Sequence, residues 1–284
     1  GICYALNMNN RTARISNSPD ASVDIIIPFS IKHQSFEFII TSISESAFKN
    51  NVKIKSISFS SNSQLLLIEN EAFSHSSLQY ITIPSHTSQL GERVFEYCND
   101  LITVGFSDNS ELIIISKETF SNSSIQNLTI PSKVEQLKEG WCDNTTKLTN
   151  VTIEAGNKHF SYYQNSKQII VGKSDPKSDT FDSLVFVSRD IEQITIPDSI
   201  IYINSFSFSG CLTLKSITFS EGSELQMIDK NSFSNSTVEF LSIPSKVVEL
   251  KEGWCHRTPR LNKVDISPLN ENFAYLDHDQ KMIV

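Results

Sequence analysis

One short pattern recurs along almost the whole chain and limits the folds that the chain can adopt. An apolar residue is followed three and five positions later by two more apolar residues, and this pattern occurs nine times, starting at Ile54. The starts are separated by 24, 23, 24, 23, 43, 23, 24 and 23 residues, so the long step equals one repeat plus an insert of 20 residues. A unit of this length cannot bury its apolar side chains alone, whereas stacked units bury a continuous core. The repeat therefore predicts a solenoid.

Each repeat contains a segment with the pattern of a β-strand. Apolar and polar residues alternate within it, which is the period of an extended strand. Several of these segments end in Ile-Pro, at Pro28, Pro84, Pro131, Pro197 and Pro244, and proline ends a strand because it has no amide hydrogen for the ladder. Tracts rich in serine and asparagine elsewhere in the repeat favour tight turns. We therefore expect one parallel strand per repeat, with turns and a return segment on the other side.

A second apolar slot keeps the same period. An apolar residue is followed five positions later by phenylalanine in six repeats, and in two repeats cysteine takes the place of this phenylalanine. The cysteine is preceded by tryptophan, as Trp141–Cys142 in "PSKVEQLKEGWC" and as Trp254–Cys255 in "PSKVVELKEGWC". Ten of these twelve positions are identical because a whole block of the chain is duplicated at an offset of 113 residues. The pattern favours a structural role for both tryptophans over a catalytic one.

Full repeats resemble those of a known family. Units such as "LQYITIPSHTSQLGERVFEYCND" and "IEQITIPDSIIYINSFSFSGCLT" are similar to the L-x-x-I-x-I-P-x-x-v-x-x-I-x-x-x-A-F-x-x-C repeat of the BspA-like, or Treponema-type, leucine-rich repeats. The resemblance implies a leucine-rich-repeat solenoid that is mostly β, with a parallel sheet on the concave face. Short 3₁₀ or irregular segments are then expected on the convex side.

The same resemblance predicts how the rest of the chain is organised. We expect residues 1–284 to form a single solenoid of about nine or ten repeats of 23–24 residues, with a candidate N-terminal cap in residues 1–22. The segments "NKHFSYYQNSKQIIV" and "NENFAYLDHDQKMIV" resemble a degenerate hairpin found in the family. They predict hairpin-type inserts at residues 154–187 and 267–284.

The resemblance also carries a functional expectation. It implies a cell-surface or secreted protein, a surface antigen for cell adhesion and protein binding in the extracellular space, whose ligand is a protein or glycan of host matrix, host cells or other microbes. An intracellular leucine-rich-repeat scaffold for protein–protein interaction is the alternative, because the first residues show no signal-peptide pattern. A purely structural surface-coat role is a third reading. Gly1 in place of Met suggests a mature or excised chain, and the oligomeric state stays open.

The sequence offers little for catalysis, metals or other partners. It contains no nucleotide-binding or hydrolase motif, and its five cysteines form no C-x-x-C pair, so we expect a non-enzymatic protein without cofactor or metal. The net charge of −8 argues against nucleic acid, and no apolar run approaches the roughly 18 residues of a membrane-spanning helix. Repeat spacing places the cysteines too far apart for disulfides. We expect buried free thiols at Cys98, Cys142, Cys211 and Cys255.

The polar positions of the predicted strands form the candidate binding face. Side chains alternate across a strand, so these residues point to the concave side of the solenoid. Most are serine or threonine, which also suit any exposed strand position. Tyr80 and Phe240 differ, because an exposed aromatic ring on a flat polar sheet is a natural hot spot. The candidate binding residues are Tyr80, Thr82, Thr103, Asn127, Thr129, Asn150, Thr152, Gln193, Thr195, Thr218, Phe240 and Ser242.

Sequons for N-glycosylation are about as frequent as the composition produces by chance, so they do not support secretion. Glycans at Asn127 and Asn150 would cover the predicted face, and binding would then move to the convex side or the inserts. The candidate sites are Asn10, Asn122, Asn127, Asn144, Asn150 and Asn235.

Overall fold

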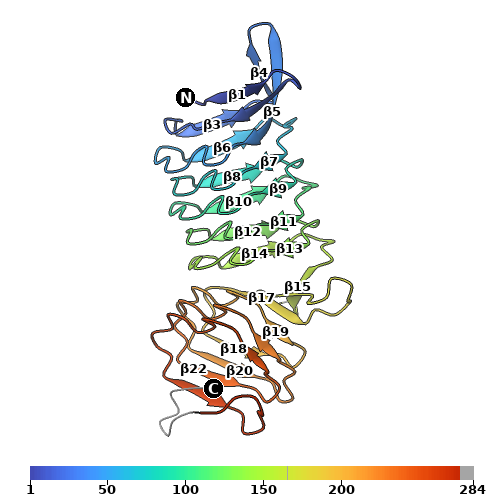
Figure 1. Ribbon diagram of the computed structural model, residues 1–284, viewed down its shortest axis with the longest axis vertical. Coiled ribbons are helices and arrows are strands. Elements are labelled where there is room, and N and C mark those ends of the chain that lie inside the picture. Colours follow the sequence, from blue (N-terminus) through green and yellow to red (C-terminus); the bar gives the residue numbers. More distant parts are fainter. Residues whose placement is uncertain (165, 276–284) are drawn as a thin grey trace. The chain divides into compact units, whose positions relative to one another are not determined.

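The computed structural model describes residues 1–164 and 166–275 (Figure 1). All regular structure in these residues is β-strand, and they contain neither an α-helix nor a 3₁₀ helix. The chain divides into two compact units, Gly1–Lys158 (unit 1) and His159–Val284 (unit 2). Each unit is a β-solenoid with two parallel ladders. That both units continue one single solenoid stays a prediction.

The strands predicted from the repeat form the main sheet of unit 1. Its order is β14-β12-β10-β8-β6-β3, and neighbouring strands run parallel. Each step along the sheet advances one repeat, so Tyr80 lies opposite Ser56 on one side and Thr103 on the other. Strands β8 and β12 end directly before proline, as expected. The strands are β3 (Asp24–Ile27), β6 (Ser56–Phe59), β8 (Tyr80–Ile83), β10 (Thr103–Phe106), β12 (Asn127–Ile130) and β14 (Asn150–Ile153).

A second sheet of unit 1 lies where we expected 3₁₀ or irregular segments. Its order is β1-β2-β5-β7-β9-β11-β13, and four of its strands are parallel pieces of two residues, one per repeat. In three of these pieces the second residue, Ile68, Leu90 or Ile115, is buried in the core, while the backbone pairs with the next repeat. Successive repeats therefore pair their backbone N–H and C=O groups in two sheets, the main sheet and the second sheet. The strands are β1 (Tyr4–Asn7), β2 (Thr12–Ile15), β4 (Ser30–His33), β5 (Phe36–Ile43), β7 (Leu67–Ile68), β9 (Gln89–Leu90), β11 (Ile114–Ile115) and β13 (Gln136–Leu137).

Two antiparallel hairpins stand at the N-terminal end of this second sheet. β1 pairs with β2, and β4 pairs with β5 (Figure 1). β2 runs parallel to β5, with a bulge where Ala13 faces Ile40 and Arg14 faces Ser42, so Thr41 is the extra residue. Residues 1–22 thus contain a hairpin at the end of the sheet, and their capping role stays a prediction.

Unit 2 repeats this arrangement. Its main sheet has the order β18-β20-β22-β24, and its second sheet has the order β15-β16-β17-β19-β21-β23. The segment 154–187, where we expect a hairpin-type insert, contains β15, β16 and β17 in antiparallel pairing. Of the insert expected at 267–284, residues 276–284 lie outside the described residues. The strands are β15 (Phe160–Tyr163), β16 (Ser166–Gly172), β17 (Ser183–Val187), β18 (Gln193–Ile196), β19 (Tyr202–Ile203), β20 (Ser216–Phe219), β21 (Met227–Ile228), β22 (Phe240–Ile243), β23 (Glu249–Leu250) and β24 (Lys263–Ile266).

The phenylalanine slot forms a stack through the core of unit 1. Phe48, Phe73, Phe95 and Phe120 are fully buried, and successive ring centroids lie 5.2, 5.5 and 5.5 Å apart with interplanar angles of 5° or less. The backbone N–H of Phe73 donates to Val94 O in the next turn at 2.9 Å. The turns are therefore tied together by their own hydrogen bonds, and the slot is core packing as predicted.

Left-handed residues recur four positions apart in these turns. Glu71 and His75 have φ of 55° and 59°, and Arg93 and Tyr97 have φ of 54° and 53°. Both N–H groups of each pair donate to the following turn. Asparagine tolerates this conformation better than most residues, which explains the Asn in tracts such as "FSNSS". The asparagines with positive φ in these turns are Asn50, Asn122, Asn144, Asn231 and Asn235.

Candidate functional site

The outward face of the main sheet of unit 1 carries most of the predicted binding residues. Along β8 the side chains of Ile81 and Ile83 are buried, whereas Tyr80 and Thr82 are exposed. The same alternation holds along β12 and β14, where Leu128 and Val151 are buried. The period of two therefore identified the solvent-facing side of each strand correctly.

Two large side chains are exposed on this face, Ile26 in β3 and Tyr80 in β8, and Tyr80 is the aromatic one. It is 48% exposed, and its neighbours in register, Ser56 and Thr103, are small. Beside it Thr82 lies opposite Gly105, which has no side chain. The ring of Tyr80 thus stands on a nearly flat surface of short polar side chains, as a contact residue for a partner would.

Along β12 and β14 this face is a band of paired amides and hydroxyls. The Nδ2 group of Asn150 donates to Oδ1 of Asn127 at 3.1 Å, and Thr129 lies opposite Thr152. Such cross-strand pairs stabilise the sheet by roughly 0.2–1 kcal/mol each. They also leave hydrogen-bonding groups directed toward solvent.

Unit 2 presents a smaller face of the same kind. Gln193, Thr195 and Thr218 are exposed, and the hydroxyl oxygens of Thr195 and Thr218 are 2.9 Å apart. Phe240 is only partly exposed, and Lys263 Nζ lies 5.6 Å from the centroid of its ring. Lys263 also bonds Asp265 at 3.0 Å. Phe240 is therefore part of a small charged cluster rather than an isolated aromatic residue.

The twelve predicted residues fall into two groups. Seven belong to the main sheet of unit 1, and five, namely Gln193, Thr195, Thr218, Phe240 and Ser242, belong to the main sheet of unit 2. Tyr80 and Phe240 lie in different units, so each face is a candidate site by itself. Their role in binding stays a prediction, as does the concave curvature expected for the main sheets.

Grooves at the carboxyl ends of the main strands were not predicted. In unit 2 a groove of about 590 Å³ runs past Phe219, Pro244 and Asp265. In unit 1 a groove of about 210 Å³ lies at the equivalent place, beside Phe59 and Pro84. In both units the groove lies where a repeat whose main strand ends in phenylalanine is followed by a repeat whose main strand ends before proline. This alternation is the feature of the sequence that could have indicated the grooves.

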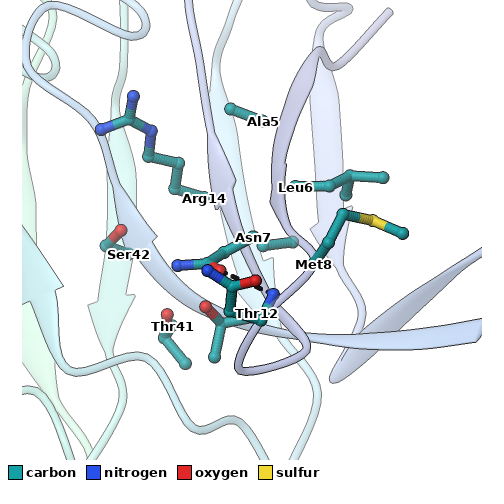
Figure 2. A pocket seen from close by; sticks show the side chains of 10 residues that line it. Ala5, Leu6, Asn7, Met8, Thr12, Arg14, Thr41 and Ser42 are labelled. Carbon is teal, nitrogen blue, oxygen red and sulfur yellow. Dashed lines mark hydrogen bonds between the residues drawn. The ribbon is translucent and has the colours of Figure 1, made fainter.

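A pocket at the N-terminal hairpin was also missed. It has a volume of about 510 Å³ and lies between the β1–β2 hairpin and the bulge in β5 (Figure 2). Its polar lining includes Asn7, Thr12, Arg14 and Ser42. The Asn-rich turn in "YALNMNNRTARI" signals a hairpin, but the pocket depends on residues 30 positions further along the chain.

Three of the five cysteine thiols are buried. Cys98, Cys142 and Cys211 are buried, which confirms that part of the prediction, whereas Cys255 is half-buried and Cys3 is exposed. Burial raises the pKa of the Cys98 thiol to about 12, and the thiol donates to Phe73 O at 3.0 Å. Burial also raises the pKa of Cys211, against the opposing charge of Arg189.

The remaining expectations concern metals, membranes and sequons. In residues 1–164 and 166–275 no three His, Cys, Asp or Glu side chains are grouped so that they could hold a metal ion. No helix long and apolar enough to cross a membrane is found in this part of the chain. Among the sequons, Asn10 and Asn150 are exposed, whereas Asn122, Asn127, Asn144 and Asn235 are partly buried.

Comparison with solved structures identifies the fold. The pneumococcal vaccine antigen PcpA has a TM-score of 0.72 at 20% identity, over 94% of this chain and 80% of that chain. A leucine-rich repeat protein from Eubacterium ventriosum ATCC 27560 has a TM-score of 0.69 at 18% identity, over 93% and 70%. A leucine rich cell surface protein from Faecalibacterium prausnitzii A2-165 has a TM-score of 0.54 at 19% identity, over 94% and 93%. At these identities the similarity concerns the fold.

The sequence also matches a family profile, although no curated protein matches it. The profile describes the BspA type leucine rich repeat region, and six copies match residues 41–170 and 179–276. The matched segments contain every predicted binding residue and the second apolar slot of the repeat. Because they cover most of the chain, the protein belongs to the BspA-type leucine-rich repeat family.

Proposed function

We infer that the protein is a non-enzymatic recognition protein of the cell surface or the secreted space, which adheres to a protein or glycan on a host or microbial surface. Binding uses the outward face of a main sheet, as solenoid repeats generally use their extended surfaces. The observation that carries this proposal is Tyr80, an exposed ring on a flat polar sheet. The solved structures support the location, since one similar protein is described as a vaccine antigen and another as a cell surface protein.

The location is tested on intact source cells. Antibody labelling without permeabilisation should detect the protein, and protease treatment of the intact cells should remove the signal. Labelling that requires permeabilisation would contradict a surface or secreted location. It would favour the intracellular scaffold instead, a reading that the five free cysteines support.

The binding face is tested with aromatic variants of the full chain. Tyr80→Ala should weaken adhesion to host cells or matrix at least about tenfold, because a hot-spot residue contributes 2 kcal/mol or more. Phe240→Ala reports on the face of unit 2 separately. Tyr97→Asn is the matched control, since Tyr97 is an exposed aromatic residue of a turn, and Asn suits its φ of 53°. Equal adhesion of Tyr80→Ala, Phe240→Ala and the control would exclude both main-sheet faces.

A further inference from the structure

The pocket at the N-terminal hairpin is built by two distant segments of unit 1. The β1–β2 hairpin supplies one wall, and the bulged part of β5 supplies the other. The bulge sets Arg14 opposite Ser42 and leaves Thr41 as the extra residue beside the pocket. Bulges commonly re-aim side chains near functional sites. The result is a cavity of about 510 Å³, within the size range of small-molecule sites.

The polar lining offers several hydrogen-bond donors. Asn7 Oδ1 accepts from the backbone N–H of Asn9 at 3.0 Å, so Asn7 can offer a ligand its Nδ2 group. Thr41 and Ser42 add two hydroxyls on the opposite strand. Figure 2 shows these side chains together with Arg14 around the cavity.

The charge of the pocket is opposite to that of the chain. Its lining includes Arg14 but no aspartate or glutamate, whereas the whole chain has a net charge of −8. Arg14 is exposed, and it forms no ion pair with the acidic residues of the described chain. A guanidinium group binds carboxylates with two parallel N–H···O bonds. The site therefore suits an anionic group.

The polar side chains share one face of the hairpin. In the register of β1 and β2, Asn7 lies opposite Thr12 and Ala5 lies opposite Arg14, so these side chains point to the same side, whereas Leu6 points to the other. Figure 2 agrees, since Leu6 and Met8 lie away from Arg14. A pocket of this volume with one cation and several amide and hydroxyl groups has more room than a lone anion needs. The ring of an acidic sugar fits this combination, because it presents hydroxyls at its rim beside the carboxylate.

We propose that this pocket binds the carboxylate of an acidic saccharide. Arg14 holds the carboxylate, and Asn7 and Ser42 donate to ring hydroxyls or to the same carboxylate. The pocket lies outside the main-sheet face, so this assignment holds or fails independently of the proposed adhesion through Tyr80.

The test compares three small probes on the full chain. Binding of glucuronate, glucose and acetate is followed by NMR shifts of the amides of residues 5–14 and 41–42. Glucuronate should bind at least about tenfold more tightly than either glucose or acetate, because only glucuronate combines the carboxylate with the ring hydroxyls. Equal affinity for glucose would overturn the role of the charge, and equal affinity for acetate would overturn the role of the sugar.

Two variants and one control assign the residues. Arg14→Gln should weaken glucuronate binding about tenfold or more, and Asn7→Asp should do the same, because it keeps the acceptor for Asn9 but adds a negative charge. Arg260→Gln, an exposed arginine of unit 2, makes the same change in net charge and should have no effect. Glucuronate affinity that is unchanged in both pocket variants, or that falls equally in the control, would overturn the proposal.

Discussion

At the scale of single residues, close contacts between successive coils decide which side chains the fold accepts. Gly91 follows β9, and its N–H donates to Ile68 O of the preceding repeat at 2.7 Å. A Cβ atom at this position would lie 2.5 Å from the backbone nitrogen of Asn70. Gly105 lies on the exposed face of β10, where the atom nearest to a Cβ atom would be Thr82 Oγ1, at the ordinary distance of 3.5 Å. A close backbone contact therefore requires glycine at position 91, whereas position 105 has room for a side chain.

Alanine substitution should separate these two positions. Gly91→Ala should lower the free energy of unfolding by about 1–3 kcal/mol, because a backbone atom must move to admit the methyl group. Gly105→Ala should leave it unchanged or raise it by up to about 1 kcal/mol, because glycine weakens a strand. Urea denaturation of both variants measures the difference. Equal changes in the free energy of unfolding would show that the close approach of residue 91 to Asn70 does not exclude a side chain at that position.

At the scale of elements, charged side chains connect successive turns of unit 1. Lys49 forms an ion pair with Glu71 of the next turn, and Arg93 contacts both Glu71 and Glu118. The hydrogen bond from Lys49 lowers the pKa of Glu71 below its ordinary value of 4.5, despite some opposing burial. The ionised carboxylate is therefore favoured by folding, and this contribution to stability is present above pH 4.5.

The contribution should disappear in acid. As the pH falls from about 4.5 through the lowered pKa, Glu71 becomes protonated in the folded state too, and the gain is lost. Glu71→Gln should therefore reduce the Tm at pH 7 and have a smaller effect at pH 3. Thermal denaturation at both pH values measures this, and Glu224→Gln, whose ion pair with Lys246 is more exposed, is the control. A difference in Tm that is equal at both pH values would contradict the assignment.

The phenylalanine stack is the apolar counterpart of this charge ladder. Phe95 stacks against Phe73 and Phe120, whereas Phe48 stacks against Phe73 at the start of the column. Phe95→Leu should destabilise the protein by about 1–2 kcal/mol. Phe48→Leu should destabilise the protein less than Phe95→Leu does. The difference should be about 0.5–1.5 kcal/mol, which is the contribution of one aromatic pair. Urea denaturation compares the two variants, and an equal or larger loss for Phe48→Leu would show that stacking adds nothing beyond burial.

At the scale of the whole molecule, stability should follow the division into two units. One cluster of buried residues, from Val171 to Val247, lies entirely within unit 2. In a solenoid each repeat contacts only its neighbours, so a destabilising substitution should affect mainly the repeats close to it. Leu65 and Leu225 offer a matched pair, because each is fully buried and follows a serine hydroxyl that accepts its backbone N–H.

Leu225→Ala should accelerate amide hydrogen exchange in β20 and β22 while leaving β8 and β10 protected. Leu65→Ala should accelerate exchange in β8 and β10 while leaving β20 and β22 protected. The reason is that either substitution should lower the free energy of unfolding of its own unit by about 2–5 kcal/mol. Exchange that accelerates equally in both units after either substitution would instead show that the two units open cooperatively.

The sequence by itself determined the repeat, the position of each main strand and the residues that face the core. It could do so because burial alternates along a pleated strand, so Ile81 and Thr82 reveal their sides locally. Tertiary structure decided what depends on the neighbouring coil or on distant residues. The second sheet needed backbone pairing between repeats, the cation beside Phe240 needed Lys263 of the next repeat, and the pocket at Arg14 needed residues 41–42 beside the first hairpin. No local pattern encodes such contacts, since they join residues that the chain separates by 20 positions or more.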